Sequence, residues 1–240
     1  MTYIDASGMD YRQLNAAIRD CSGDASVTDC YGQRFIGAGL EEGNLSITGT
    51  PGNALGAYLN GACIEVRGNA QDAVGDTMNA GRIVIHGSIG DAAGYAMRGG
   101  ELYVEGNAGY RAGIHMKAYG DKLPVMVIGG KAGSFLGEYQ AGGIIIVLGL
   151  TAGPRPIVSN FPCTGMHGGK LYIRSDCKKL LLPKQVIARP ASRKDMNEVR
   201  DYLHTFCQLF GGNCDALLRQ PFTVITPNSS NPYKQLYVTN

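Results

Sequence analysis

The 240-residue chain has no tryptophan, almost no net charge and no long hydrophobic run. Its 22 Lys and Arg against 20 Asp and Glu give a net charge of +2, which provides no sign of nucleic-acid binding. The longest apolar run, residues 144–148, is far too short to span a bilayer. The first ten residues lack both the basic and the apolar region of a signal peptide. We therefore expect a cytoplasmic protein that binds neither nucleic acid nor membrane.

Motifs that carry chemistry are missing as well. The seven cysteines are scattered and form no CxxC pair, which indicates reduced thiols. The four histidines have no metal-ligand spacing, and the chain contains no GxSxG, HExxH or P-loop motif. The sequence therefore predicts no metal site, no cofactor-binding site and no catalytic residue.

Glycine is the residue in excess, with 35 of 240 positions, and it recurs mostly at an interval of 19 residues. One column consists of Gly49, Gly68, Gly87, Gly106, Gly130 and Gly149, and a second of Gly37, Gly56, Gly75, Gly94, Gly113 and Gly137. Between them lie segments whose second and fourth residues are nearly all apolar, namely residues 44–48, 63–67, 82–86, 101–105, 125–129, 144–148 and 170–174. This alternation predicts strands with one buried face, and residues 25–29 fit as a degenerate eighth strand.

A strand in every 19 residues, with glycines at the reversals, predicts an all-β fold. We expect a right-handed parallel β-helix of about seven turns with flanking N- and C-terminal helices. A nucleotide-binding glycine motif would occur once, before a helix, so we interpret these glycines as structural. They permit positive φ angles and close approach of neighbouring turns. Another 19-residue column is interpreted as a stack of core side chains: Leu59, Met78, Met97 and Met116.

The expected organisation is a strand and helix cap at 1–24, the β-helix at 25–175, and a C-terminal helix and arm packing on the coil at 176–240. Apolar residues at helical spacing predict helices over 10–21 and 193–210, the second capped by Ser192.

Outward strand positions give two further expectations. Stacked turns should bring Arg67, His86 and Glu105 side by side; we favour a surface ion ladder over an acid/base site. Other outward positions are apolar where solvent exposure would be expected, and we expect the chain's own helix and arm, rather than a partner, to cover them: Val84, Tyr103, Val125, Val127, Ile144, Ile146 and Tyr172.

Two insertions interrupt the period. Five residues are added between Gly113 and Gly130, and seven between Gly149 and Ser175. We expect both to emerge on the same side of the rod and to form a face for a partner. The candidate interface residues in these segments are Lys117, Tyr119, Lys122, Arg155, Phe161 and His167.

Several stretches carry a family resemblance: GQRFIGAGL (32–40), GYRAGIHMK (109–117), VIGGKAGSFLGEYQAGGIIIVLGL (127–150) and TGMHGGKLYIR (164–174). They resemble the C-terminal GXGXG domain of the glutamate synthase large subunit, over about residues 4–175. The length and the C-terminal extension look like the separately encoded third part of that subunit in archaeal-type enzymes. One of the subunits of formylmethanofuran dehydrogenase is similar to the same coil.

The resemblance implies a scaffold subunit without catalytic residues, in glutamate biosynthesis by ammonia assimilation. Its partners would be an amidotransferase subunit, which hydrolyses glutamine, and an FMN and iron–sulfur synthase subunit, which forms glutamate from 2-oxoglutarate and ammonia. The chain departs from the whole enzyme at Thr2, where that amidotransferase class has a nucleophilic cysteine. Two alternatives stay open: a formylmethanofuran dehydrogenase component, and an independent β-helix enzyme that uses Arg67, His86 and Glu105. A homo-oligomer is also compatible with the sequence.

Overall fold

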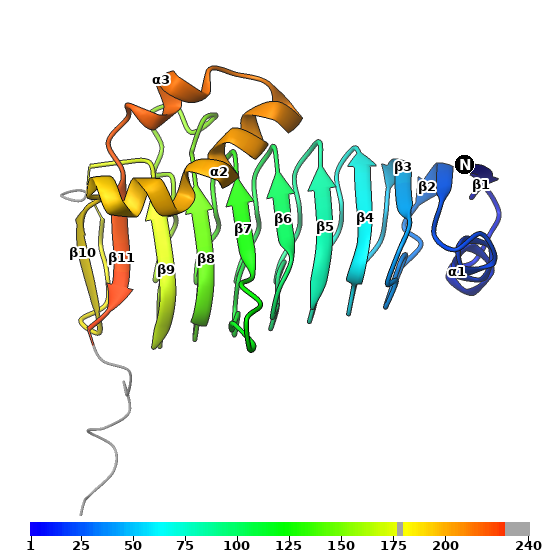
Figure 1. Cartoon of the computed structure of the whole chain (residues 1–240), viewed down its shortest axis with the longest axis horizontal. Helices are drawn as coiled ribbons and strands as arrows, with labels where there is room; N and C mark the ends of the chain where they lie inside the picture. The colour runs from blue at the N-terminus through cyan, green and yellow to red at the C-terminus, as the bar shows by residue number, and fades with distance from the viewer. Residues whose placement is uncertain (177–179, 229–240) are drawn as a thin grey trace, which may run out of the picture.

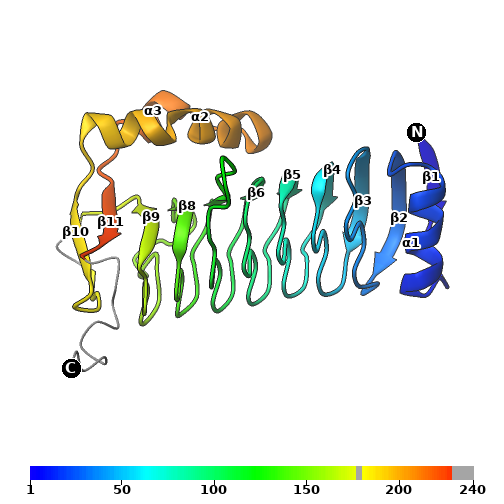
Figure 2. The ribbon, with the colours of Figure 1, turned by 60° about the horizontal axis from the view of Figure 1, so that its bottom comes forward.

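The computed structural model describes residues 1–176 and 180–228. Within them, the strands β1–β11 form one sheet, and the chain from β1 to β9 winds as a right-handed parallel β-helix (Figures 1 and 2). The strands are β1 (Thr2–Asp5), β2 (Ala25–Tyr31), β3 (Asn44–Thr50), β4 (Asn60–Arg67), β5 (Ala80–Ile85), β6 (Glu101–Val104), β7 (Val125–Ile128), β8 (Ala141–Val147), β9 (Gly168–Ile173), β10 (Val186–Pro190) and β11 (Thr223–Pro227). The helices are α1 (Tyr11–Asp20), α2 (Arg193–Phe210) and α3 (Cys214–Leu218).

The strands β1 to β9 pair in parallel and in sequence order, which confirms the predicted coil. The apolar second positions align in register, from Leu45 through Ile64 and Ile83 to Leu171. The strand predicted at 25–29 lies within β2 and brings the coil to about eight turns. The sheet ends with β11 antiparallel to β9 and β10 antiparallel to β11, an end that the period did not predict.

Each turn has three parts. After the strand comes a short pairing segment, in which Ala70, Ile89, Ala108, Ala132 and Val158 form a parallel ladder of single bridges. A return segment then leads to the next strand. There every second residue has a positive φ, as at Ala92 (55°), Gly94 (66°) and Ala96 (50°), and its backbone N–H groups bond to the turns before and after it.

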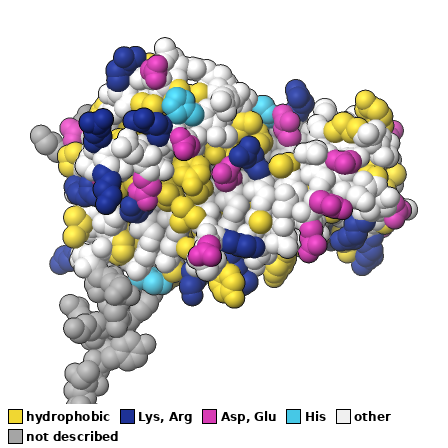
Figure 3. Space-filling view, in the orientation of Figure 1, with side chains coloured by type: hydrophobic (Ala, Val, Ile, Leu, Met, Phe, Trp, Pro, Cys, Tyr) yellow, Lys and Arg dark blue, Asp and Glu magenta, His cyan; other side chains and the backbone are white. Residues whose placement is uncertain are grey.

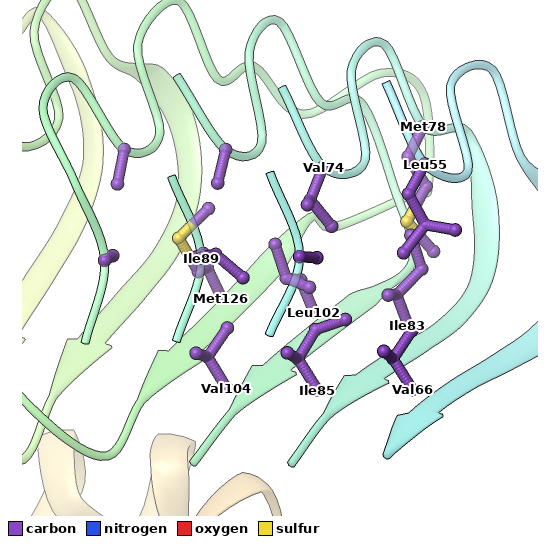
Figure 4. Packing of buried hydrophobic residues seen from close by; sticks show 14 of the residues in the cluster. Leu55, Val66, Val74, Met78, Ile83, Ile85, Ile89, Leu102, Val104 and Met126 are labelled. Atoms are coloured by element: carbon purple, nitrogen blue, oxygen red, sulfur yellow. The ribbon is translucent and has the colours of Figure 1, made fainter. Parts of the chain in front are cut away.

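The core lies inside the coil, where side chains from the strands meet those from the return segments (Figure 4). The labelled strand residues Ile83 and Leu102 face Leu55 and Val74 across it, and all four side chains are fully buried. The predicted stack of Leu59, Met78, Met97 and Met116 is confirmed, since every member has no exposed surface.

Both long helices occur where the sequence predicts them. Asp10 caps α1, which closes the N-terminal end of the coil with Leu14 and Ile18 (Figure 2). Ser192 caps α2, which begins and ends at the predicted residues. The C-terminal arm after 228 lies outside the described residues.

Candidate interaction surfaces

The outer face of β6–β9 is covered by the chain's own helix. The fully buried Tyr103 and Tyr172 pack with Val199, Leu203 and Phe206 of α2 in a second hydrophobic cluster. Outside this cluster, Lys and Arg side chains gather around α2 and the C-terminal end of the rod (Figure 3). The expectation that the chain itself covers the outward apolar positions is therefore confirmed for α2, and this face is not open to a partner.

The charged residues predicted to be neighbours do meet, on the outer face beyond the end of α2. His86 Nε2 lies 2.8 Å from Glu65 Oε1, and His86 Nδ1 lies 3.9 Å from Glu105 Oε2. Arg67 joins the row through Glu65 at 3.5 Å, and the His86 ring packs edge-on against Phe210 with centroids 5.1 Å apart. Most of these side chains are well exposed, and such pairs contribute about 0–1 kcal/mol each.

The hollows in the surface lie elsewhere. Two of them have volumes of about 240 and 200 Å³ and adjoin each other between α1 and the first return segment. Their linings share Arg19 and Ala38 and include none of the residues of the charged row. In residues 1–176 and 180–228, no group of three His, Cys, Asp or Glu side chains is arranged to hold a metal ion.

The two insertions leave the coil at opposite ends of the strands, so the expectation of a common side is wrong. The backbone bonds Lys117 N to Met97 O and Val125 N to Gly100 O place the first insertion directly before β7. The second lies between residues 150 and 157, after β8. The 19-residue period gives the size of an insertion but not which corner of the turn accommodates it.

The predicted interface residues are accordingly divided. Lys117, Tyr119 and Lys122 lie on the first insertion, a small hairpin closed by pairing of Tyr119 with Lys122, and Tyr119 is 68% exposed. His167 occupies the position equivalent to Lys117 in a later turn. The backbone N–H of Lys117 bonds to Met97 O and that of His167 bonds to Gln140 O, and these two carbonyls have equivalent positions in their own turns. Arg155 is exposed on the other insertion.

Phe161 belongs to a third region, the turn face, which we define as the outward side chains of the return segments. There Phe161 stacks on Phe135 with centroids 5.3 Å apart, and His115 stacks on Tyr139 at 5.1 Å with Tyr95 edge-on. This surface was not predicted from the sequence. The sequence nevertheless contains a signal for this surface, because these aromatic residues fall near the second glycine column in successive turns.

The family model for the GXGXG motif matches residues 11–228. The chain belongs to the GXGXG family. A similar protein is "Uncharacterized protein MJ1350" of Methanocaldococcus jannaschii, which is 42% identical over 248 residues, covering 98% of this chain and 95% of the relative. No helix in the described part of this GXGXG protein is long and apolar enough to cross a membrane.

Among solved structures, the chain is similar to a chain of the formyltransferase/hydrolase complex from Methylorubrum extorquens, crystallised with methylofuran. The TM-score is 0.52 at 18% identity, and the match covers 92% of this chain and 89% of the other. At this identity the likeness shows a shared fold.

Proposed function

We propose that this GXGXG protein is a non-catalytic scaffold subunit of a glutamate-synthase-like complex. One observation carries the scaffold part of the proposal: the structural match to a chain of a multisubunit complex covers 92% of this chain and 89% of that one. The coil and its helices are thus nearly all that the two chains contain, which favours a role in assembly. The motif stretches favour the glutamate synthase branch, with an amidotransferase and an FMN and iron–sulfur synthase as partners.

The hairpin before β7 is our proposed contact with these partners. It combines the exposed Tyr119 and the 43% exposed Leu123 with the basic Lys117 and Lys122. An aromatic anchor with basic neighbours is common in protein interfaces.

Co-purification from the native organism tests the assignment. The tagged full chain should retain the amidotransferase and the synthase. Given a two-electron reductant, the reassembled complex should convert 2-oxoglutarate to glutamate with glutamine-derived ammonia only when this chain is present. The double variant Y119A/K122E should lose the partners, whereas K194E, at an exposed lysine of α2, should retain them. Stoichiometric FMN or iron in the chain purified alone would contradict a scaffold without cofactors.

The solved structure favours a second candidate, a subunit of a formylmethanofuran-related complex. In that case the same purification should retain formyltransferase or hydrolase chains, and the glutamate-forming activity should be absent.

A further inference from the structure

Two cysteines meet at the turn between α2 and α3. Cys207 is in the last turn of α2, where its carbonyl accepts the N–H of the capping residue Gly211 at 2.8 Å. Cys214 is the first residue of α3, which folds back on α2 (Figures 1 and 2). Their thiols are hydrogen-bonded to each other. Because the pair has no CxxC spacing, it was not predicted from the sequence.

The thiols elsewhere in the described residues have different neighbours. Those of Cys21 and Cys30 donate to oxygen atoms of their own segments. Cys163 is fully buried in the core of the coil, and Cys63 is exposed. These four thiols thus have oxygen, apolar groups or solvent beside them, whereas each thiol at the α2–α3 turn has a second sulfur within reach.

The pair is accessible, and the turn between its members can adjust. Both side chains are partly exposed at the edge of the second hydrophobic cluster. Gly211 and Gly212 form the turn, with φ angles of 83° and 105°, and a Cβ at either glycine would have no atom within 4 Å. The turn therefore has free space in which to reach the Cα separation of about 4.4–6.8 Å that a disulfide requires.

The two thiols differ in their readiness to ionise. Burial, and after it the electrostatic influence of Cys207, raises the pKa of Cys214 to about 11. Because the thiolate is the nucleophile in disulfide exchange, Cys207 is the sulfur that attacks first. A raised pKa also withholds the thiolate stabilisation that makes some dithiols strong oxidants once they are in the disulfide form, which favours a stable disulfide here.

We propose that Cys207 and Cys214 form a redox-active pair, whose reversible disulfide joins the end of α2 to the start of α3. The oxidant is a small disulfide such as oxidised glutathione. The Cys207 thiolate attacks one of its sulfurs and releases one glutathione thiolate. Cys214 then loses its proton, attacks the Cys207 sulfur and releases the second glutathione thiolate. The two electrons thus reduce glutathione, and the two thiol protons pass to its two thiolates.

This disulfide would restrain the helical cover of the coil. Cys207 follows Phe206, which lies in the cluster under α2, and Phe210 packs on His86 with ring centroids 5.1 Å apart. The short helix α3 contributes Leu217 to the same cluster. A bond between the two helices should therefore raise the melting temperature, because it restricts the unfolded chain. The pair is independent of the hairpin contact and of which complex the chain joins.

Peptide mapping of the full chain after exposure to excess oxidised glutathione tests the pair. Both cysteines lie in one tryptic peptide, residues 201–219. After alkylation of the remaining thiols, this peptide should carry no alkyl group and should have lost two hydrogen atoms, and dithiothreitol should restore both thiols to alkylation. C207S and C214S should each keep one thiol, free or bound to glutathione, whereas C63S should still close the disulfide. Alkylation of both thiols in the oxidised wild type, or glutathione on both, would overturn the proposal.

Equilibration in glutathione buffers distinguishes a pair held by the fold from two thiols that are merely close in the chain. In a C63S background, the folded protein should close the disulfide with an equilibrium constant about tenfold or more above that of the same chain unfolded in urea, a difference of about 30 mV. The oxidised protein should melt at a higher temperature than the reduced one, and C207S/C214S should melt at the same temperature with and without the oxidant. Equal constants for the folded and unfolded chains, or a lower melting temperature after oxidation, would refute a fold that holds the two sulfurs ready to bond.

Discussion

Three glycine-to-alanine substitutions separate the two demands that the coil places on glycine. Gly39, Gly81 and Gly94 all have positive φ, at 69°, 93° and 66°. A Cβ at Gly39 would have no atom within 4 Å, one at Gly94 would overlap the terminal methyl of Met126, and one at Gly81 would overlap the carbonyl oxygen of Ala62. All three alanines would therefore share the strain of a positive φ. G94A adds an overlap with a side chain that can move, and G81A adds an overlap with backbone that cannot move freely.

The expected costs follow from these surroundings. G39A should lower the free energy of unfolding by about 1–2 kcal/mol, the cost of a left-handed conformation with a Cβ. G94A should cost slightly more, because the Met126 methyl can rotate away within the core. G81A should cost about 3 kcal/mol or more, since overpacking adds about 1–3 kcal/mol where the neighbour is the backbone of the preceding turn.

Urea unfolding followed by far-ultraviolet circular dichroism measures all three variants against the wild type, with equal m-values as the check on the unfolding model. The reasoning is refuted if G39A costs as much as G81A, because strain alone would then explain the glycines. It is equally refuted if G81A costs less than about 1 kcal/mol.

Three further predictions concern the C-terminal helix and the thiols. Hydrogen bonding to Arg189 is the main cause that lowers the pKa of the buried Asp195 carboxyl, so its contribution to stability is complete above about pH 4 and declines as the pH falls below that value; D195N should destabilise most at pH 7 and less at pH 3, and thermal melts that show the same loss at both pH values would contradict this. F206A should cost about 3–5 kcal/mol in urea unfolding, because the ring is 2% exposed in the cluster under α2; a loss below about 1 kcal/mol would contradict that packing. Burial raises the pKa of Cys163 to about 12, so a thiol reagent at pH 8 should modify the exposed Cys63 first, and mass mapping that finds Cys163 labelled first would contradict its burial.

The period in the sequence was sufficient to predict the strands, because one apolar face per strand and one reversal per turn repeat together. The alternation by itself assigns Leu102 and Val104 to the core and Tyr103 to the outer face. The end of the sheet was not predictable in this way. Since β10 and β11 pair antiparallel, outside the repeat, no 19-residue spacing points to Val186–Pro190.

The candidate surfaces could be predicted only in part from the 19-residue period. Spacing along the chain placed Arg67, His86 and Glu105 in neighbouring turns, and the structure brings His86 and Glu105 together. The turn face was missed because the return segments follow neither the strand nor the helix conformation: every second residue there has a positive φ, as at Ala92, Gly94 and Ala96.

Cys163 shows what glycine provides in this fold. The second glycine column stops at Gly137 in the sequence, yet Cys163 N–H bonds to Leu136 O as Gly137 N–H bonds to Ala112 O, and Cys163 has a φ of 60°. The equivalent bonds in each turn hold other residues in left-handed conformations too, such as Thr77 and His115. A positive φ alone therefore does not require glycine here. Glycine is required where a Cβ would overlap a neighbouring turn, which is why the substitution at Gly81 should be the costly one.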